Sequence, residues 1–393
     1  MSSTPTLTIT ASKARTVRFE ALDGLRGIAA LVVVLSHCTL LYETLWNTIY
    51  LHDKTQGLLD PVFWITRTPL SMFVSGTQAV YIFFVLSGFV LTLTFTKGDG
   101  NNILPYLCKR IPRLWLPMAF AVSLSAIIFT FVHRPPLAMG QSDWCGYCYV
   151  VHPFSLVFQQ LSLTDASSPM NALDPPTWSL VHEMRISIVL PAIIFALIRW
   201  RSLALAASSL LSLAAVMIMH RIQNPLILNL VDILQYICLF AIGAAIYLSL
   251  QKVRSFLIRL PKFAVPAGWC ISIILFILTY RQDVFLLHAQ WKIVASIAAT
   301  IMMIVAVDSR RNVVLMSRPV LWLGKVSYSL YLVHTSILLS TLYICGGRLP
   351  LLIPIAITIP VSLLAAEGMN RWIERPSQSI GRQLAAKAVS IWH

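Results

Sequence analysis

Residues 25–44 read LRGIAALVVVLSHCTLLYET, an apolar run of membrane-spanning length near the start of the chain. About 20 helical residues cover the roughly 30 Å hydrocarbon core of a bilayer, where backbone groups need partners within their own segment. The run is therefore predicted to be a transmembrane helix. Composition agrees, because 57% of the 393 residues are hydrophobic and 11% are charged, whereas soluble domains carry about 25% charged residues.

Similar apolar runs recur along the chain without a long polar interval. They predict an all-α membrane protein, a bundle of about ten transmembrane helices that forms one membrane domain. The long loops at 45–77 and 133–176 could cover a substrate opening. The predicted spans are residues 25–44, 78–96, 114–132, 177–198, 203–220, 228–250, 265–281, 292–308, 326–344 and 351–372.

Basic residues account for the net charge of +15, with 30 Lys and Arg against 15 Asp and Glu. They concentrate before the first predicted span and after every even-numbered one. This positive-inside pattern predicts a multi-pass protein of the inner (cytoplasmic) membrane with both termini in the cytoplasm. Because the basic residues lie between apolar runs, no nucleic-acid partner is expected. The clusters are Lys13/Arg15/Arg18, Lys97/Lys109/Arg110/Arg113, Arg199/Arg201, Lys252/Arg254/Arg259/Lys262, Arg310/Arg311/Arg318/Lys325 and Arg371/Arg375/Arg382/Lys387.

The predicted organisation is a cytoplasmic N-terminal segment (1–20), a membrane domain (21–376) and a basic cytoplasmic tail (377–393). The first apolar run lacks a small-residue cleavage site, so it is read as a retained helix. Cys145 and Cys148 are spaced as in a thioredoxin-type motif, but they lie in a loop between membrane helices rather than in a βαβ unit. A disulfide and two free thiols both remain open for this pair.

The first predicted helix carries two ionisable groups on one face. Arg26 and His37 are eleven residues apart, which is about 16 Å along a helix and within about 20° of the same direction. Ionisable groups inside a bilayer are costly and are functional candidates by default. One reading is a cytoplasmic cation with a buried base near mid-membrane. The other is a hydrogen-bonded structural histidine and an arginine that reaches the interface.

Other polar positions allow a functional and a structural reading. Arg110 and Arg113, at the start of the third span, could clamp a phosphate with help from the helix dipole, or simply follow the positive-inside bias. Ser87 with Gly88 suits close helix packing. No metal site is predicted.

The fourth span brings three ionisable residues, His182, Glu183 and Arg185, to its non-cytoplasmic end. Glu183 either pairs with Arg185 or acts with His182 to orient an acceptor hydroxyl. His334 and Glu367 lie inside the ninth and tenth spans, where either could merely connect helices.

Taken in order, these stretches resemble the acyltransferase 3 family of integral-membrane acyltransferases. The ordered combination, over roughly residues 20 to 376, is more specific than any single motif. The resemblance rests on Asp23–Ala30 with His37, the Phe-Phe-Val-Leu-Ser-Gly-Phe stretch ending at Phe89, Arg110 with Arg113, Trp178-Ser179-Leu180 with Glu183, Ser327–His334 and Glu374-Arg375-Pro376.

The resemblance implies an O-acyltransferase that moves an acyl group, usually acetyl, from cytoplasmic acyl-CoA to a hydroxyl of a cell-surface or secreted acceptor. His37 matches the family's essential histidine, with Glu183 as a second catalytic candidate. Arg26, Arg110 and Arg113 match positions linked to the acyl donor. Supporting positions are Asp23, Ser87, Tyr328 and His334.

Acetyl-CoA is then the expected co-substrate, with no permanently bound cofactor, and a carbohydrate or lipid-linked glycan is the expected acceptor. Some relatives carry an extracytoplasmic hydrolase-like domain, and this chain is expected to be a stand-alone form. The alternative is a secondary transporter with an intramembrane His/Glu/Arg relay, followed by a scaffold. The acceptor's identity, the acyl length, the oligomeric state and the choice between direct transfer and an acyl-enzyme remain open.

Overall fold

The structure is a computed structural model that describes residues 19–51, 57–98, 102–133, 135–136, 138–147, 153–163, 173–279, 288–346 and 349–391. Within these ranges the chain is helical and contains no strand, apart from an isolated bridge between Tyr42 and Gln141. The main helices are α1 (Glu20–Thr39), α4 (Gly76–Gly98), α5 (Ile103–Phe131), α8 (Thr177–Arg199), α9 (Arg201–Ile218), α10 (Pro225–Leu248), α11 (Leu250–Arg259), α12 (Ala264–Leu278), α13 (His288–Ala306), α14 (Arg318–Cys345), α15 (Leu352–Met369) and α16 (Arg375–Ile391).

The predicted all-α membrane fold is confirmed, and each of the ten predicted spans coincides with one of these helices. Among the described residues, eight helices are long and apolar enough to cross a bilayer. The number is nine if α11 and α12, which meet at 109°, count as one broken span. The apolar part of α13, Gln290–Ala306, is shorter. The side on which each terminus lies stays a prediction, and residues 1–18 fall outside the described part.

Two helix boundaries differ from the prediction in ways that affect the site. α1 begins at Glu20 and ends at Thr39, so His37 lies in its last turn. α5 begins eleven residues before the predicted span, because the Asn102 side chain accepts a hydrogen bond from the Leu104 N–H at 3.1 Å and caps the helix. Arg110 and Arg113 therefore lie two to three turns inside α5. The prediction that a helix N-terminus would help to bind phosphate at these two arginines was wrong, since the effect of the helix dipole fades beyond the first turn.

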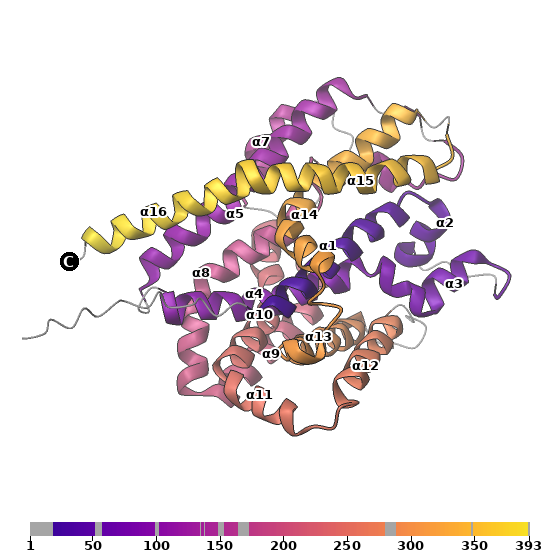
Figure 1. The fold of residues 1–393 in the computed structure, drawn as a ribbon. Coiled ribbons are helices and arrows are strands. Elements are labelled where there is room, and N and C mark those ends of the chain that lie inside the picture. Colours follow the sequence, from indigo (N-terminus) through magenta and orange to yellow (C-terminus); the bar gives the residue numbers. More distant parts are fainter. Residues whose placement is uncertain are drawn as a thin grey trace, which may run out of the picture.

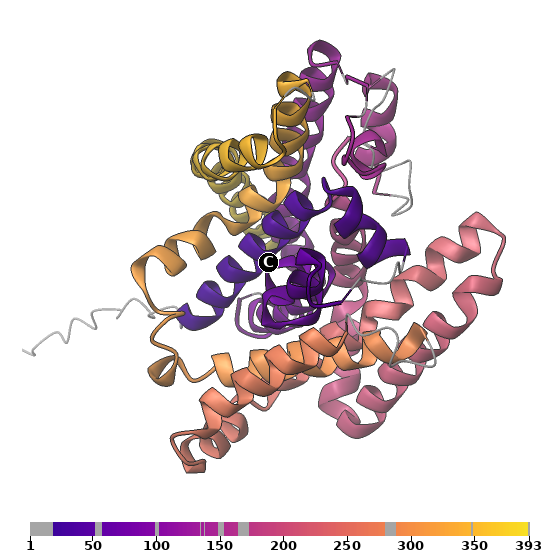
Figure 2. The same cartoon turned by 90° about the vertical axis from the view of Figure 1, so that its right-hand side faces the viewer.

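α1 and α4 occupy the middle of the bundle, where α1 packs against α14 and α4 against α10. Glycines allow both contacts: a Cβ on Gly27 would lie 2.4 Å from the backbone nitrogen of Gly324, and one on Gly88 2.1 Å from the carbonyl oxygen of Phe240. Gly88 thus serves the helix packing expected of the Ser87-Gly88 pair. The α12–α13 pair lies on the opposite side of α1 and α4 from α15 and α16 (Figures 1 and 2).

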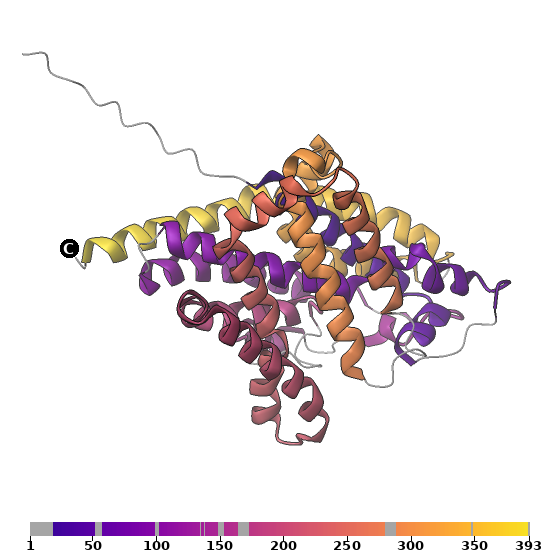
Figure 3. The same ribbon diagram turned by 90° about the horizontal axis from the view of Figure 1, so that it is seen from below.

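The C-terminal helices form one long rod. α15, the π-helical turn η6 (Asn370–Glu374) and α16 follow one another without a break, so residues Leu352–Ser390 form one continuous helix that contains a stretch apolar enough to span a membrane. α16 runs alongside α5 (Figures 1 and 3), where a Cβ on Gly381 would lie 2.9 Å from the Lys109 carbonyl oxygen. The part of the predicted tail up to Ile391 is therefore a helix that packs against the bundle.

The two long loops contain short helices, and part of the second loop is bound to the end of α1. The Ser142 N–H donates to the Leu41 carbonyl at 3.0 Å, and the Tyr343 hydroxyl donates to the Cys145 carbonyl at 2.8 Å. Cys145 is buried, and its pairing with Cys148 falls outside the described residues. The short helices of these loops are α2 (Glu43–Trp46), η1 (Asn47–Leu51), α3 (Pro61–Arg67), η2 (Pro69–Val74), α6 (Trp144–Tyr147) and α7 (Pro153–Leu161). Two further short helices, η3 (Met219–Arg221) and η5 (Ser309–Arg311), follow α9 and α13.

Candidate active site

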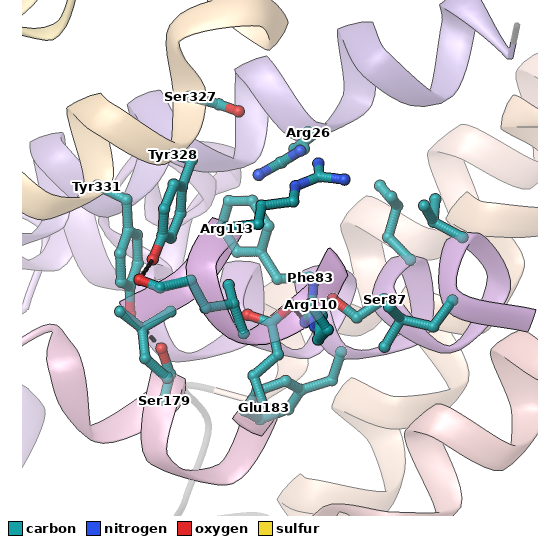
Figure 4. Close-up of a pocket in the computed structure, with 16 residues that line it drawn as sticks. Arg26, Phe83, Ser87, Arg110, Arg113, Ser179, Glu183, Ser327, Tyr328 and Tyr331 are labelled. Atoms are coloured by element: carbon teal, nitrogen blue, oxygen red, sulfur yellow. Dashed lines mark hydrogen bonds and ion pairs between the residues drawn. The ribbon is translucent and has the colours of Figure 1, made fainter. Parts of the chain in front are cut away.

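Three arginines from two helices converge on one small pocket. Arg26 of α1 and Arg110 and Arg113 of α5 line it together with Glu183 of α8. Figure 4 shows the guanidinium groups of Arg26 and Arg113 side by side, with Arg110 near Glu183. All three predicted donor-binding residues are therefore in the same site, although eighty-four to eighty-seven residues separate Arg26 from the other two.

Glu183 is held in this pocket by an ion pair with Arg110. The Ser87 hydroxyl donates to the same carboxylate oxygen at 2.6 Å, and Arg110 Nε donates to the Ser187 hydroxyl at 3.2 Å. Glu183 thus pairs with Arg110 rather than with Arg185, which donates to the Asn229 carbonyl on α10. This placement explains Ser87 as an anchor of the carboxylate and makes Glu183 a positioning group for Arg110.

The pocket carries an excess of positive charge. Arg26 and Arg113 make no ion pair in the described part of the chain, so three guanidinium groups face one carboxylate. Guanidinium groups bind phosphate and carboxylate oxygens through charge-assisted hydrogen bonds, so the pocket suits an anionic group. The cavity is small, about 70 Å³.

His37 lies against a second histidine on α14. Their ring centroids are 4.9 Å apart, and His334 Nε2 is 3.3 Å from His37 Nδ1. Arg26 shares its pocket with Ser327 and Tyr328, two turns before His334 on the same helix. Arg26 and His37 therefore share one face of α1, as their spacing predicted, and that face is turned to α14.

The hydrogen bonds of His37 indicate which nitrogen is available for chemistry. Nδ1 lies 2.9 Å from the Val33 carbonyl oxygen, which can only accept, so Nδ1 carries the proton in the neutral ring. Nε2 then holds the lone pair, and the described residues offer it no hydrogen bond. His334 is fixed in a similar way, with Nδ1 at 3.0 Å from the Leu330 carbonyl. The half-buried His37 ring thus presents an unpaired acceptor nitrogen.

Tyr331 separates the arginine pocket from the two histidines. Its ring lines the pocket and lies 6.1 Å from the His334 ring, centroid to centroid. Its hydroxyl is 2.7 Å from the Ser179 hydroxyl and donates to the Pro176 carbonyl at 3.0 Å. Ser179 and Tyr331 stand in the motifs that carried the family resemblance, but the sequence assigned neither a place in the site.

Two of the four supporting residues are placed near the pocket by backbone contacts. The Tyr328 hydroxyl donates to the Leu114 carbonyl at 2.7 Å, which ties α14 to α5. Asp23 lies in the first turn of α1, and its carbonyl oxygen would lie 2.1 Å from a Cβ on Gly324. Ser87 and Tyr328 line the pocket, and Asp23 and His334 lie on α1 and α14, two of the helices that contribute to it.

A buried carboxylate at the end of η6 was missed as a site residue. Glu374 accepts hydrogen bonds from the Ser329 hydroxyl at 2.8 Å and from the Asn370 side chain at 2.9 Å, and it is 4% exposed. It connects the C-terminal rod to α14 one residue beyond Tyr328. The Glu374-Arg375-Pro376 motif was the available signal, but its partner on α14 is set by tertiary packing.

His182 belongs to a different polar network, although it is next to Glu183 in sequence. Its Nε2 lies 3.1 Å from Asp232 on α10, and its Nδ1 is buried without a partner in the described residues. Lys292 on α13 donates to Gln235 at 2.7 Å, one turn from Asp232. Successive helix residues point about 100° apart, so only Glu183 faces the arginine pocket. Elsewhere, Glu367 pairs with Lys325 at 3.0 Å on the surface.

The described residues contain no cluster of three or more histidine, cysteine or acidic side chains that could hold a metal ion. The observed arrangement is an imidazole with an available nitrogen at one end and a pocket with an excess of positive charge at the other.

Comparison with known proteins identifies relatives over most of the chain. It is 25% identical over 340 residues to YrhL of Bacillus subtilis, whose name assigns it provisionally to peptidoglycan O-acetylation. It is 26% identical over 328 residues to the O-acetyltransferase OatA of Staphylococcus aureus, and 22% identical over 395 residues to the peptidoglycan O-acetyltransferase OatA of Listeria monocytogenes. These alignments cover 80%, 78% and 93% of the chain.

The chain spans about half the length of these relatives, with 52%, 53% and 58% of their residues matched. No solved structure matches it. A family model described as an acyltransferase domain matches residues 19–366, which include Arg26, His37, Arg110, Arg113, Glu183 and His334. The chain therefore belongs to the acyltransferase 3 family.

Proposed function

We propose that this protein is an O-acetyltransferase that moves an acetyl group from acetyl-CoA to a hydroxyl of a carbohydrate acceptor. The observation that carries the proposal is the pairing of the arginine pocket with the open His37 Nε2 along one face of α1. The names of the relatives support O-acetylation of a glycan such as peptidoglycan. Family membership also favours an enzyme over the transporter alternative.

The donor is inferred from the charge and length of the site. The pocket has a charge excess suited to the diphosphate of CoA. His37 lies eleven residues beyond Arg26 on the same helix, about 16 Å away. An extended pantetheine arm covers a distance of this order, so the thioester would reach His37 when the diphosphate lies at the arginines.

In the proposed reaction, His37 Nε2 accepts the proton of the acceptor hydroxyl while the hydroxyl oxygen attacks the thioester carbonyl. The carbon–sulfur bond breaks, and the proton passes to the CoA thiolate, so that the products are the O-acetyl ester and CoA. The Nδ1–H···O=C bond to Val33 keeps the ring in the tautomer required for this step. In this arrangement, the protein lies in the inner membrane of the cell, and the end of the bundle that carries Arg254 and Arg310 faces the cytoplasm.

The test is transfer of label from radiolabelled acetyl-CoA to a glycan extract by the purified protein. His37→Ala should lower the rate by roughly 10²–10⁴-fold, the usual contribution of a positioned acid or base. His133→Ala is the matched control, because His133 is exposed in the loop after α5. An active His37→Ala protein would contradict the role of His37. Transfer of acetyl groups from a donor in a membrane extract, but not from acetyl-CoA, would contradict the proposal that acetyl-CoA is the donor.

A further inference from the structure

A second basic cleft lies at the end of the bundle where α1 begins. It has a volume of about 520 Å³, within the range typical of small-molecule sites. One wall is α11, and the other is the segment that follows α13. The polar residues that line it are Arg254, Asp308, Ser309, Arg310 and Arg311, so three guanidinium groups face one carboxylate.

Two of these arginines have no acidic partner among the described residues. Arg311 is engaged, since its Nε lies 3.3 Å from Asp308 and it donates to the Leu257 carbonyl at 3.2 Å. Arg254 and Arg310 make no ion pair or hydrogen bond to any described residue. A positive-inside bias accounts for arginines at this end of the molecule. It does not account for their convergence on one cleft, where unpaired like charges repel each other.

The cleft is close to the arginine pocket. The Arg254 guanidinium carbon lies 5.3 Å from the centre of the Phe19 ring, and Phe19 directly precedes α1. Arg26 follows seven residues later, about 10 Å along the helix. A donor whose diphosphate lies at Arg26 therefore has its nucleotide end within reach of Arg254.

We infer that this cleft binds the 3′-phosphate on the ribose of acetyl-CoA, with Arg254 and Arg310 as its ligands. The inference rests on the proposed function and extends it, because it names the part of the donor that the enzyme selects. A ribose phosphate is a dianion at neutral pH, and two unpaired guanidinium groups match its charge and its oxygens. The phosphate is also the group by which CoA differs from its dephosphorylated precursor.

The experiment compares acetyl-CoA with acetyl-dephospho-CoA, which keeps the thioester and the diphosphate but lacks the 3′-phosphate. With the unmodified protein, KM for the dephospho donor should be about tenfold higher or more, the loss expected for one or two charge-assisted hydrogen bonds. In the Arg254→Gln/Arg310→Gln variant, KM for acetyl-CoA should rise to the dephospho value while kcat and KM for the dephospho donor stay unchanged. Arg259→Gln is the matched control, since Arg259 is exposed on the same helix and outside the cleft.

The outcomes separate the two proposals. Equal KM values for the two donors with the unmodified protein would overturn the cleft assignment and leave the proposed function standing. This comparison needs no variant, so it holds even if the double substitution fails to fold. A double variant that loses activity equally with both donors would also overturn the assignment, and would point to a lipid headgroup or a structural role. Absence of transfer from either donor would overturn the proposed function and the assignment together.

Discussion

The ion pair between Arg110 and Glu183 makes a prediction that separates a positioning role for Glu183 from a catalytic one. The two side chains are 8% and 16% exposed, so both charges are largely removed from water. Removing one partner of a buried pair costs about 3–5 kcal/mol, because the other charge is left uncompensated. Glu183→Gln would leave Arg110 beside Arg26 and Arg113 with no carboxylate in the pocket.

We therefore expect Glu183→Gln to lower the free energy of unfolding by about 3 kcal/mol, the lower end of that range because the site is not fully dry. The Arg110→Gln/Glu183→Gln variant removes both members of the pair, so neither is left without its partner, and it should cost about 1 kcal/mol. The double variant should thus be more stable than Glu183→Gln alone by about 2 kcal/mol, which is the non-additive behaviour of two groups in contact.

The assay is thermal unfolding in mild detergent, followed with a thiol-reactive dye. Cys38 is buried and would react on unfolding. Glu367→Gln is the matched control, because its pair with Lys325 is 37–38% exposed and should contribute less than about 1 kcal/mol. Additive losses in the double variant would refute the pairing argument. A Glu183→Gln protein of normal stability with a raised acceptor KM would restore the acceptor-orienting role.

Two further predictions concern stability. Gly27→Ala should lower the free energy of unfolding by about 2 kcal/mol, because the added Cβ would lie 2.4 Å from the backbone nitrogen of Gly324. Gly268→Ala should cost less, since its Cβ would meet a methyl group of Val305, which can move, at 2.6 Å. Equal thermal midpoints for the two variants would contradict this expectation. Burial raises the pKa of Asp174 well above its usual range, and its carboxylate oxygens have no partner among the described residues. The cost of ionising Asp174 therefore destabilises the fold as pH rises above the unfolded-state pKa. Asp174→Asn should raise the thermal midpoint more at about pH 8 than at about pH 5. An equal rise at both pH values would contradict this prediction.

The helices could be predicted because each apolar run must form its own backbone hydrogen bonds in a bilayer. The start of α5 was placed too late because residues 103–113 carry basic side chains that lower hydrophobicity. Asn102 is a favourable N-cap residue and was an available signal. The shared face of Arg26 and His37 followed from helical periodicity alone.

The partners across helices could not be predicted in the same way. Glu183 pairs with Arg110 and not with the nearby Arg185 because α5 and α4 both pack against α8, where they bring Arg110 and Ser87 to the carboxylate. Glu374 reaches Ser329 for a comparable reason, across a separation of 45 residues. A helix period fixes the face on which a residue lies, but the neighbour on that face is fixed by packing.

The size of the arginine pocket indicates what must change when a donor binds. Its 70 Å³ has room for only a few water molecules, so the arm of a donor held at Arg26 can approach His37 only if Tyr331 moves aside. Tyr331 is held by hydrogen bonds of 2.7 and 3.0 Å, each with a net contribution of about 1 kcal/mol. Breaking both would cost about 2 kcal/mol, which is small beside the roughly 8 kcal/mol of micromolar binding. Donor binding can therefore drive the displacement of Tyr331 at a loss of about thirtyfold in affinity, and the closed pocket is compatible with transfer through His37.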